Sequence, residues 1–217
     1  MIKNTGLLIC DLSGYSAMTE AHGPKTAANL VNRYLLIVKD SMEGETILKE
    51  RVGDEVVLLS NQIDDLVRTA INMHRLAEKE SNFLSIHTGI HYGEIYEEKG
   101  HLFGTSINLA SRITAYATGG QILCSESSKN KLKSMKDYRI EYLGIKKFKN
   151  ISKPIKLFDI IYKELINQRV TDPVCQMQML RHQAGVRINY QQLTYYFCSM
   201  NCVRKFSEDP EQYIIFE

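Results

Sequence analysis

Short apolar runs alternate with longer amphipathic segments between residues 6 and 162. Compact apolar runs or period-two alternation predict strands at 7–11, 84–92, 121–124, 138–143 and 155–162. Apolar residues at helical spacing predict helices at 17–42, 63–80 and 104–117, with a short one near 125–134. Residues 45–60 predict a hairpin whose turn contains Gly53 and Asp54, because a Gly beside an acid suits a tight turn.

The predicted elements begin in the order β-α-β-β-α-β, which is the ferredoxin-like split unit. Three further strands follow it, so we expect a mixed α/β (α+β) fold with extra C-terminal strands. His74 lies on the apolar face of the helix at 63–80, where a packed core histidine is a better interpretation than a metal ligand.

The pattern changes near residue 164, where a polar stretch predicts a linker. We therefore expect one domain over 1–164, a linker over 165–171 and a small Cys-rich domain over 172–217. The last segment is too short to build a large core, so a bound metal is expected to stabilise it.

Composition narrows the classes of function. Hydrophobic residues make up 44% of the 217, which supports a packed core. The net charge of +2 is mixed along the chain and gives no reason to expect a nucleic-acid partner. No segment approaches the ~20 apolar residues that cross a bilayer, and the N-terminus leads directly into a strand, so neither a membrane partner nor a cleaved signal is expected. Five cysteines without disulfide-framework spacing favour the reducing cytoplasm.

Two carboxylates stand at the ends of apolar runs. Asp11 closes the strand at 7–11, and Asp54 precedes the strand that begins at Glu55. Strand-end carboxylates with glycines nearby are suitable ligands for hard divalent cations, which in turn hold polyphosphates. Taken alone, both residues are better interpreted as ordinary turn residues, because Asp and Gly are common in turns.

The helix at 104–117 carries a second pair of polar residues. Asn108 and Arg112 are four positions apart and so share one face, while Ile107, Ala110 and Ile113 point the other way. An amide and a planar guanidinium suit ribose and phosphate oxygens, although an exposed Asn and Arg are common on any helix.

Four motifs appear together in an order and spacing that resemble the class III nucleotidyl cyclase catalytic domain, over roughly residues 5–162. They are Asp11–Ser16, Gly53–Asp54, Gly89–Gly93 and Gly104–Arg112. The resemblance implies that Asp11 and Asp54 hold two Mg²⁺ or Mn²⁺ ions, with the Leu12 carbonyl as a further ligand and Gly14 in the substrate-binding loop. It implies that Asn108 orients the ribose, that Arg112 stabilises charge at the α-phosphate, and that Lys149 binds phosphate. Asn150 stands where the family usually has Gly.

The resemblance also implies the chemistry and the assembly. The ribose 3′-hydroxyl of a nucleoside triphosphate attacks the α-phosphate, and pyrophosphate leaves. Catalysis then rests on positioning and charge neutralisation. The family builds its site across a head-to-tail dimer, with the two aspartates from one chain and the Asn–Arg pair from the other. A homodimer of this chain would thus hold two equivalent sites.

Two positions bear on the choice of base. Glu50 occupies a position where guanylate-type members usually carry Glu, which can accept hydrogen bonds from guanine. His101 occupies the second position and matches neither the adenine nor the guanine pattern. The pair favours GTP slightly and leaves ATP, or a pyrimidine nucleotide, open.

Three cysteines near the C-terminus form the second candidate site. Twenty-two residues separate Cys175 from Cys198, and three separate Cys198 from Cys202. Thiolates at such spacing can converge on one soft or borderline metal. Residues 171–215 resemble the YHS domain, with Gln176 where Gly is expected, which implies a zinc or copper ion with a structural or a sensing role. No fourth ligand is evident, and His182 is a weak candidate. Cys10 and Cys124 lie in apolar strands and are expected in the core.

The sequence thus predicts a purine nucleotide cyclase whose C-terminal metal either regulates its output or only stabilises the small domain. Two alternatives remain open. One is a cyclase fold that has lost catalysis and senses metal or nucleotide. The other is a metal chaperone whose larger domain serves as a dimerisation scaffold.

Overall fold

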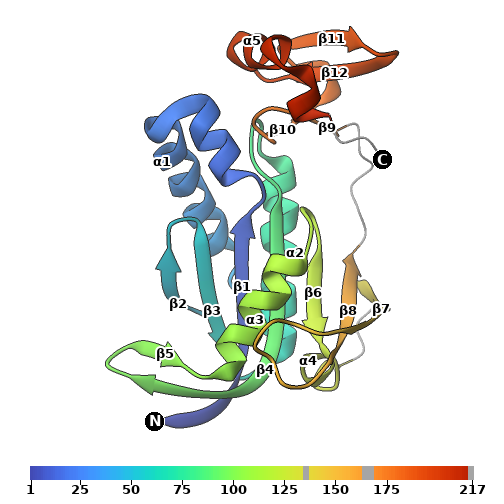
Figure 1. The fold of residues 1–217 in the computed structure, drawn as a ribbon. Helices are drawn as coiled ribbons and strands as arrows, with labels where there is room; N and C mark the ends of the chain where they lie inside the picture. Colours follow the sequence, from blue (N-terminus) through green and yellow to red (C-terminus); the bar gives the residue numbers. More distant parts are fainter. Residues whose placement is uncertain (134–136, 163–168, 215–217) are drawn as a thin grey trace.

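The computed structural model describes residues 1–133, 137–162 and 169–214. Residues 1–162, the N-terminal unit, form one twisted sheet covered by helices, and residues 169–214, the C-terminal unit, sit at one end of it (Figure 1). The strands of the N-terminal unit are β1 (Ile2–Leu12), β2 (Ile47–Val52), β3 (Glu55–Ser60), β4 (Ile86–Glu98), β5 (His101–Phe103), β6 (Ile122–Ser125), β7 (Tyr138–Lys146) and β8 (Ile155–Tyr162). Its helices are α1 (Tyr15–Ser41), α2 (Ile63–Lys79), α3 (Thr105–Tyr116) and α4 (Glu126–Lys129).

The sheet has eight strands in the order β2-β3-β1-β4-β6-β8-β7, with β5 paired to β4. β1 lies in the interior, antiparallel to both β3 and β4. This register sets Cys10 opposite Val56 and Asp11 opposite His87. The end of β1 therefore lies between the β2–β3 turn and the start of β4.

The helices divide between the two faces of the sheet. Leu8, Cys10 and Leu12 of β1 belong to the core cluster that contains α1 and α2, whereas Leu7 and Ile9 pack with residues of α3. Successive side chains of a strand point to opposite faces, so a strand buried on both faces must be apolar throughout. This is why the run at 7–10 shows no alternation, and why Asp11 continues the face that α3 covers.

Helix α1 is broken at Gly23, which has φ 80° and ψ 170° and is followed by Pro24. This backbone region is open almost only to glycine, and Pro24 lacks the N–H that would continue the helix. The break leaves a first segment, Tyr15–His22, and a second that ends at Ser41. The sequence pattern predicted one continuous helix here.

The described part of the C-terminal unit contains two antiparallel strand pairs and three short helices. β9 (Arg169–Thr171) pairs with β10 (Gln178–Leu180), and β11 (Val186–Tyr190) pairs with β12 (Leu193–Phe197). The helices are η1 (Arg181–Gln183), α5 (Met200–Glu208) and η2 (Pro210–Tyr213). Its core is aromatic: the Phe206 ring contacts the rings of Tyr190, Tyr195, Phe197 and Tyr213.

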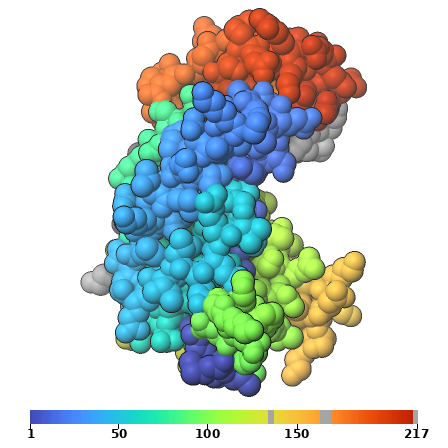
Figure 2. Space-filling view, turned by 90° about the vertical axis from the view of Figure 1, so that its left-hand side faces the viewer, coloured from blue at the N-terminus to red at the C-terminus, as the bar shows by residue number. Residues whose placement is uncertain are grey.

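The two units pack directly against each other, as Figure 2 shows for the surface of α1. Phe83, just before β4, forms an isolated antiparallel bridge with Gln178 of β10. Val174, Cys175 and Phe197 belong to the same buried cluster as the α1–α2 face of the large sheet. The C-terminal unit is therefore docked on the N-terminal unit over a common apolar core.

The predicted fold class and the β-α-β-β-α-β order are confirmed. Besides the break in α1, two strands depart from the prediction: β4 extends to Glu98 rather than residue 92, and β5 was not predicted. Of the linker expected at 165–171, residues 165–168 lie outside the described part of the chain, and Arg169–Thr171 form β9. Among the helices that the structure describes, none is both long and apolar enough to cross a membrane.

Candidate functional site

Two carboxylates meet at the end of β1. Asp11 is its penultimate residue, and Asp54 lies in the β2–β3 turn alongside. The pKa of Asp54 is raised to about 7, first because the carboxyl is half-buried and then because Asp11 adds a hydrogen bond and a second negative charge. Two crowded acids of this kind are stabilised by a cation placed between them. The pair therefore fits a divalent metal.

A histidine that the sequence analysis did not single out faces Asp11 across the sheet. His87 Nε2 lies 3.9 Å from Asp11 Oδ2, and His87 Nδ1 lies 2.8 Å from Ser13 Oγ. Burial lowers the pKa of His87, while Asp11 opposes that shift. A neutral His87 can thus orient the loop that follows Asp11 without adding a charge to it.

The loop from β1 to α1 has a constrained backbone. The Leu12 N–H donates to Asp11 Oδ1 at 2.9 Å, and Gly14 precedes α1 with φ 83°. A Cβ on Gly14 would lie only 2.4 Å from Cβ of Gln176 in the C-terminal unit. Glycine is thus required there twice, for its left-handed conformation and for the close approach of Gln176.

Asn108 and Arg112 lie on the exposed face of α3, while Ala110 and Ile113 are fully buried beneath them. Within the described part of one chain, neither polar side chain makes a hydrogen bond or ion pair, and none links them to Asp11 or Asp54. The structure therefore displays both side chains outward from α3.

Glu50 and His101 are far apart in sequence but come together at β2 and β5. His101 Nδ1 lies 3.9 Å from Glu50 Oε1, which also accepts the Leu102 N–H at 3.0 Å. The β2–β3 register shifts between Leu48 and Glu50, a bulge of the kind common beside binding sites. The two candidate base-selecting residues thus lie next to each other.

Lys149 is exposed in the turn between β7 and β8. The next residue, Asn150, has φ 64°. Asn tolerates this left-handed conformation better than most other non-glycine residues, so it can replace the expected Gly without changing the turn. Gln176, the other replacement of an expected Gly, has φ 61° and adopts the same conformation.

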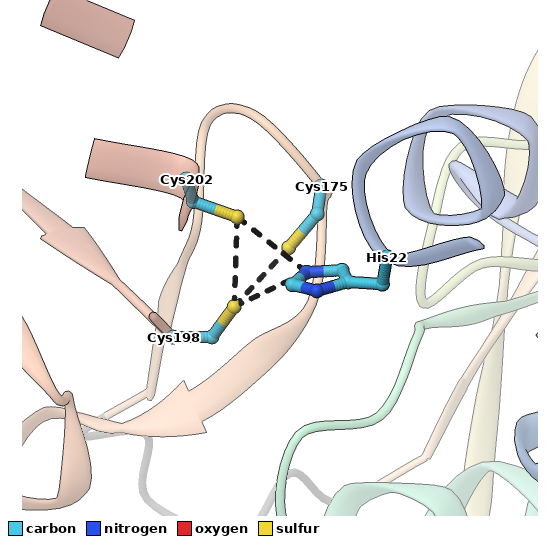
Figure 3. Close-up of side chains that lie close together, drawn as sticks. All are labelled: His22, Cys175, Cys198 and Cys202. Carbon is cyan, nitrogen blue, oxygen red and sulfur yellow. Dashed lines mark hydrogen bonds between the residues drawn. The ribbon is translucent and has the colours of Figure 1, made fainter. Parts of the chain in front are cut away.

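The three C-terminal cysteines converge, as Figure 3 shows. Cys198 Sγ lies 3.6 Å from Cys175 Sγ and 3.7 Å from Cys202 Sγ. Their loops are joined by the fully buried Asp172, whose Oδ1 accepts the Cys175 N–H and whose Oδ2 accepts the Cys198 N–H. Asp172 therefore holds both loops in the arrangement that brings the sulfurs together.

Cys202 lies in the first turn of α5, where Ser199 caps the helix by accepting the Cys202 N–H. The pKa of Cys202 is lowered because the Cys175 and Cys198 thiols donate to its sulfur. A helix N-terminus further favours a thiolate. The donor set of the cluster fits a thiophilic metal.

The fourth potential ligand is His22, at the end of the first segment of α1. The four donor atoms of His22 and the three cysteines all lie within 4.8 Å of one another. His182, the weak candidate for this ligand, lies in η1 and does not belong to the group. Cys10 and Cys124 are core residues as expected, and burial raises the pKa of each thiol to about 12.

Comparison with known families accounts for both units. Residues 1–161 match the model of the adenylate and guanylate cyclase catalytic domain, and residues 170–215 match the YHS domain. The chain belongs to the adenylate and guanylate cyclase family. From here the N-terminal unit is called the cyclase domain and the C-terminal unit the YHS domain.

Individual relatives agree. A pH-sensitive adenylate cyclase of Mycobacterium tuberculosis is 22% identical over 161 residues, covering 73% of this chain and 41% of that protein. The adenylyl cyclase CyaB from P. aeruginosa superposes with a TM-score of 0.63 at 19% identity, over 76% of this chain and 97% of that one. The guanylyl cyclase Cya2 gives a TM-score of 0.64 at 22% identity, over 77% and 96%. Adenylyl and guanylyl enzymes thus share this fold equally.

The chain spans about a third of the length of other curated relatives that it matches. An uncharacterised protein of Mycobacterium tuberculosis, for example, is 30% identical over 129 residues, covering 58% of this chain and 34% of that protein.

Sequence reasoning missed two residues of these sites, His22 and His87. The position of His87 beside Asp11 depends on the β1–β4 register, which no local pattern reveals. His22 lies in the cyclase domain, so a search for ligands confined to residues 172–217 could not find it. The available signal was the sequence His22-Gly23-Pro24, which marks a helix break with a metal-ligating side chain at its edge.

Proposed function

We propose that this chain is a nucleotidyl cyclase that converts a purine nucleoside triphosphate to the 3′,5′-cyclic monophosphate and pyrophosphate in the cytoplasm. The observation that carries the proposal is the convergence of Asp11 and Asp54, with the pKa of Asp54 raised to about 7. An acid at the end of a central strand, beside a second acid in the neighbouring turn, would form the metal half of such a site.

Asp11, Asp54 and the Leu12 carbonyl would hold two Mg²⁺ or Mn²⁺ ions. When bound, such ions lower the pKa of the ribose 3′-hydroxyl and neutralise charge on the triphosphate. The protein's own contribution is positional: the β1–β3 and β1–β4 pairing fixes the two carboxylates, and His87 orients the loop between them and α1. The N-terminus of α1 at Gly14 presents backbone N–H groups suited to phosphate oxygens.

Asn108, Arg112 and Lys149 would act on the nucleotide. The Asn108 amide is suited to orienting the ribose, and the Arg112 guanidinium to charge that develops at the α-phosphate. Lys149 is an exposed point charge on a turn and is suited to the phosphate chain. All three are expected to act through positioning and electrostatics, as phosphoryl transfer requires.

The assembly that best fits these positions is a head-to-tail homodimer. Asn108 and Arg112 point outward and contact neither aspartate within the described part of one chain. The outer edge of the sheet also exposes apolar side chains: Ile47 by 53%, Val52 by 74% and Phe103 by 51%. Burying such residues against a second copy would stabilise a twofold pair in which each Asn–Arg pair faces the other chain's aspartates.

Glu50 favours guanine slightly. Its carboxylate accepts one N–H, from Leu102, and retains lone pairs for the N1–H and 2-amino groups of guanine. His101 lies 3.9 Å from it and is 75% exposed, so it can move toward or away from a base. GTP is therefore proposed as the better substrate. ATP is the first alternative and a pyrimidine nucleotide the second.

A turnover assay tests the proposal. The purified dimer is incubated with GTP, ATP, CTP or UTP in the presence of Mn²⁺ or Mg²⁺, and cyclic nucleotide and pyrophosphate are quantified together. Asp54→Ala is expected to reduce turnover by at least ~10³-fold, since loss of one preorganised electrostatic group alone costs ~10²–10³. Gln62→Ala, an exposed residue outside the site, is the matched control and should retain activity.

The second candidate is a cyclase fold that binds nucleotide or metal without turnover. The atypical His101 beside Glu50 is the observation that favours it. Nucleotide binding in calorimetry by a confirmed dimer, with no cyclic product from any of the four triphosphates, would establish this reading over the first.

A further inference from the structure

The thiolate cluster draws its fourth donor from the other domain. His22 Nε2 lies 3.4 Å from Cys198 Sγ and 3.4 Å from Cys202 Sγ (Figure 3). The histidine comes from α1 of the cyclase domain, whereas the cysteines come from the YHS domain. In Figure 3 the imidazole points from the α1 ribbon toward the sulfurs.

The spacing of the four donors suits a tetrahedral ion. With metal–sulfur distances of ~2.3 Å and metal–nitrogen distances of ~2.0–2.1 Å, tetrahedral ligands lie about 3.8 Å apart for two sulfurs and about 3.6 Å for sulfur and nitrogen. Cys198 Sγ lies 3.6 Å from Cys175 Sγ and 3.7 Å from Cys202 Sγ, and His22 Nε2 lies 3.4 Å from both Cys198 Sγ and Cys202 Sγ. All four donor atoms lie within 4.8 Å of one another. A Cys₃His set of this size is a standard zinc environment.

The break in α1 explains why His22 is available. A helix that stops at Gly23 leaves the carbonyls of its last turn without intrahelical partners. Two YHS side chains fill that role: Asn201 Nδ2 donates to the Ala21 carbonyl at 2.8 Å, and Lys205 Nζ donates to the Glu20 carbonyl at 3.2 Å. The end of the segment is therefore docked on α5 by specific contacts, with His22 directed at the cluster.

The other end of the same segment also contacts the YHS domain. Gln176, next to the ligand Cys175, packs on Gly14 so closely that no side chain could be added there. Gly14 follows the Asp11–Leu12 pair by two residues. The YHS domain thus contacts both ends of the Tyr15–His22 segment. Gln176, next to Cys175, packs at its start, and Cys198 and Cys202 lie beside His22 at its end.

We propose that a zinc ion bound by His22, Cys175, Cys198 and Cys202 joins the two domains and fixes the Tyr15–His22 segment and the loop before it. A cavity of about 260 Å³, lined in part by His22, Met177 and Cys198, lies beside the cluster and offers the ion a route from solvent. The effect of zinc on the catalytic loop rests on the proposed cyclase function; the shared site itself does not.

Cobalt substitution tests the ligand set on the full chain. The metal-free protein is titrated with Co²⁺ alone, and the intensities of the visible d–d bands and of the thiolate-to-cobalt charge-transfer band are recorded. Wild type is expected to bind one ion per chain with the intense bands of a tetrahedral site. His22→Ala should keep the charge-transfer band, weaken or shift the d–d bands, and lose affinity by more than the roughly 10- to 100-fold that a supporting outer partner is worth. His182→Ala is the matched control, with wild-type spectra and affinity.

Hydrogen exchange then tests the joining of the domains without any activity assay. Zinc is expected to slow amide exchange in residues 15–22 as well as in 172–202 of wild type, and only in 172–202 of His22→Ala. Slower exchange confined to 172–202 in wild type would overturn the shared site, as would unchanged cobalt spectra and affinity in His22→Ala. These readouts stand even if no nucleotide is cyclised, so failure of the proposed function and failure of this inference are separable.

Discussion

Individual titratable residues of this fold are held at unusual pKa values by burial. The pKa of His74 is lowered to about 3 because the imidazole is fully buried, where its Nε2 lies 2.9 Å from Thr88 Oγ1. In the folded protein His74 is expected to stay neutral between pH 6.5 and about pH 3, whereas in the unfolded chain it becomes protonated in this range. It therefore makes stability depend on pH.

The sign follows from proton binding. Between pH 6.5 and pH 3 the unfolded state binds the proton and the folded state does not, so stability is full above pH 6.5 and is lost as the pH falls. From pH 7 to pH 5 this residue should cost wild type about 2 kcal/mol. His74→Gln keeps a polar partner for Thr88 and does not titrate. The difference in free energy of unfolding between wild type and this variant, measured in urea, should therefore fall by that amount from pH 7 to pH 5. A gap independent of pH would contradict the assignment.

Asp54 gives the opposite behaviour. Its pKa, raised to about 7, means that the folded, metal-free protein binds the proton more tightly than the unfolded chain, so stability falls as the pH rises toward and through 7. Asp54→Asn should therefore stabilise the metal-free protein at pH 8, by about 1 kcal/mol once the solvent exposure of the site is allowed for, and by little at pH 5. Thermal melts in chelator at the two pH values check this. Added Mn²⁺ should stabilise wild type and leave the variant unchanged.

At the scale of elements, the break in α1 is the feature most open to test. Gly23 adopts a backbone conformation that is essentially restricted to glycine, so Gly23→Ala should cost about 1–3 kcal/mol of stability. It should also weaken zinc binding, because the end of the first segment carries His22. Gly53→Ala is the control. Gly53 also has a positive φ, 64°, but it lies in the β2–β3 turn, far in sequence from the three C-terminal cysteines. It should lose stability and retain zinc affinity.

The elements themselves were largely predictable, because each is specified by local periodicity. The hairpin around Gly53 and the helix that carries Asn108 and Arg112 follow directly from apolar spacing. The features that could not be predicted depend on contacts between segments that are distant in sequence. Glu50 and His101 come together only because β5 lies beside β2 in the folded chain. His22 reaches the cysteines only because the YHS domain docks on α1.

Asn150 and Gln176, the two departures from the family patterns, show where the sequence suggested a larger change than the structure contains. At the level of sequence, each replaces an expected glycine and suggests a changed loop. In the structure both adopt a left-handed conformation, which favours glycine, with φ of 64° and 61°. These loops therefore have a backbone that suits glycine, and the Gln176 side chain adds a contact with Gly14 that glycine could not make.

At the scale of the whole molecule, the proposed assembly makes a strict prediction for mixed subunits. If each site combines Asp54 of one chain with Arg112 of the other, Asp54→Ala and Arg112→Ala homodimers are each inactive. Subunits exchanged at equal amounts form heterodimers with one intact site, and so recover about a quarter of wild-type activity. The assay is cyclic-nucleotide production after dissociation and reassociation.

The matched control mixes Asp11→Ala with Asp54→Ala, two changes proposed for the same half of the site. No heterodimer of these chains contains an intact site, so mixing should restore nothing. Activity recovered in the control, or none recovered in the first mixture, would exclude the head-to-tail arrangement.

The ligand pattern also has a topological consequence for how the chain unfolds. An ion held by residue 22 and by residues 175–202 closes a covalent-like loop through nearly the whole polypeptide, and it removes conformational entropy from the denatured ensemble. The zinc-bound chain should therefore melt in a single cooperative transition in calorimetry, with both domains lost together. Removal of the ion would let the small aromatic core around Phe206 unfold first, at lower temperature and while the large sheet persists.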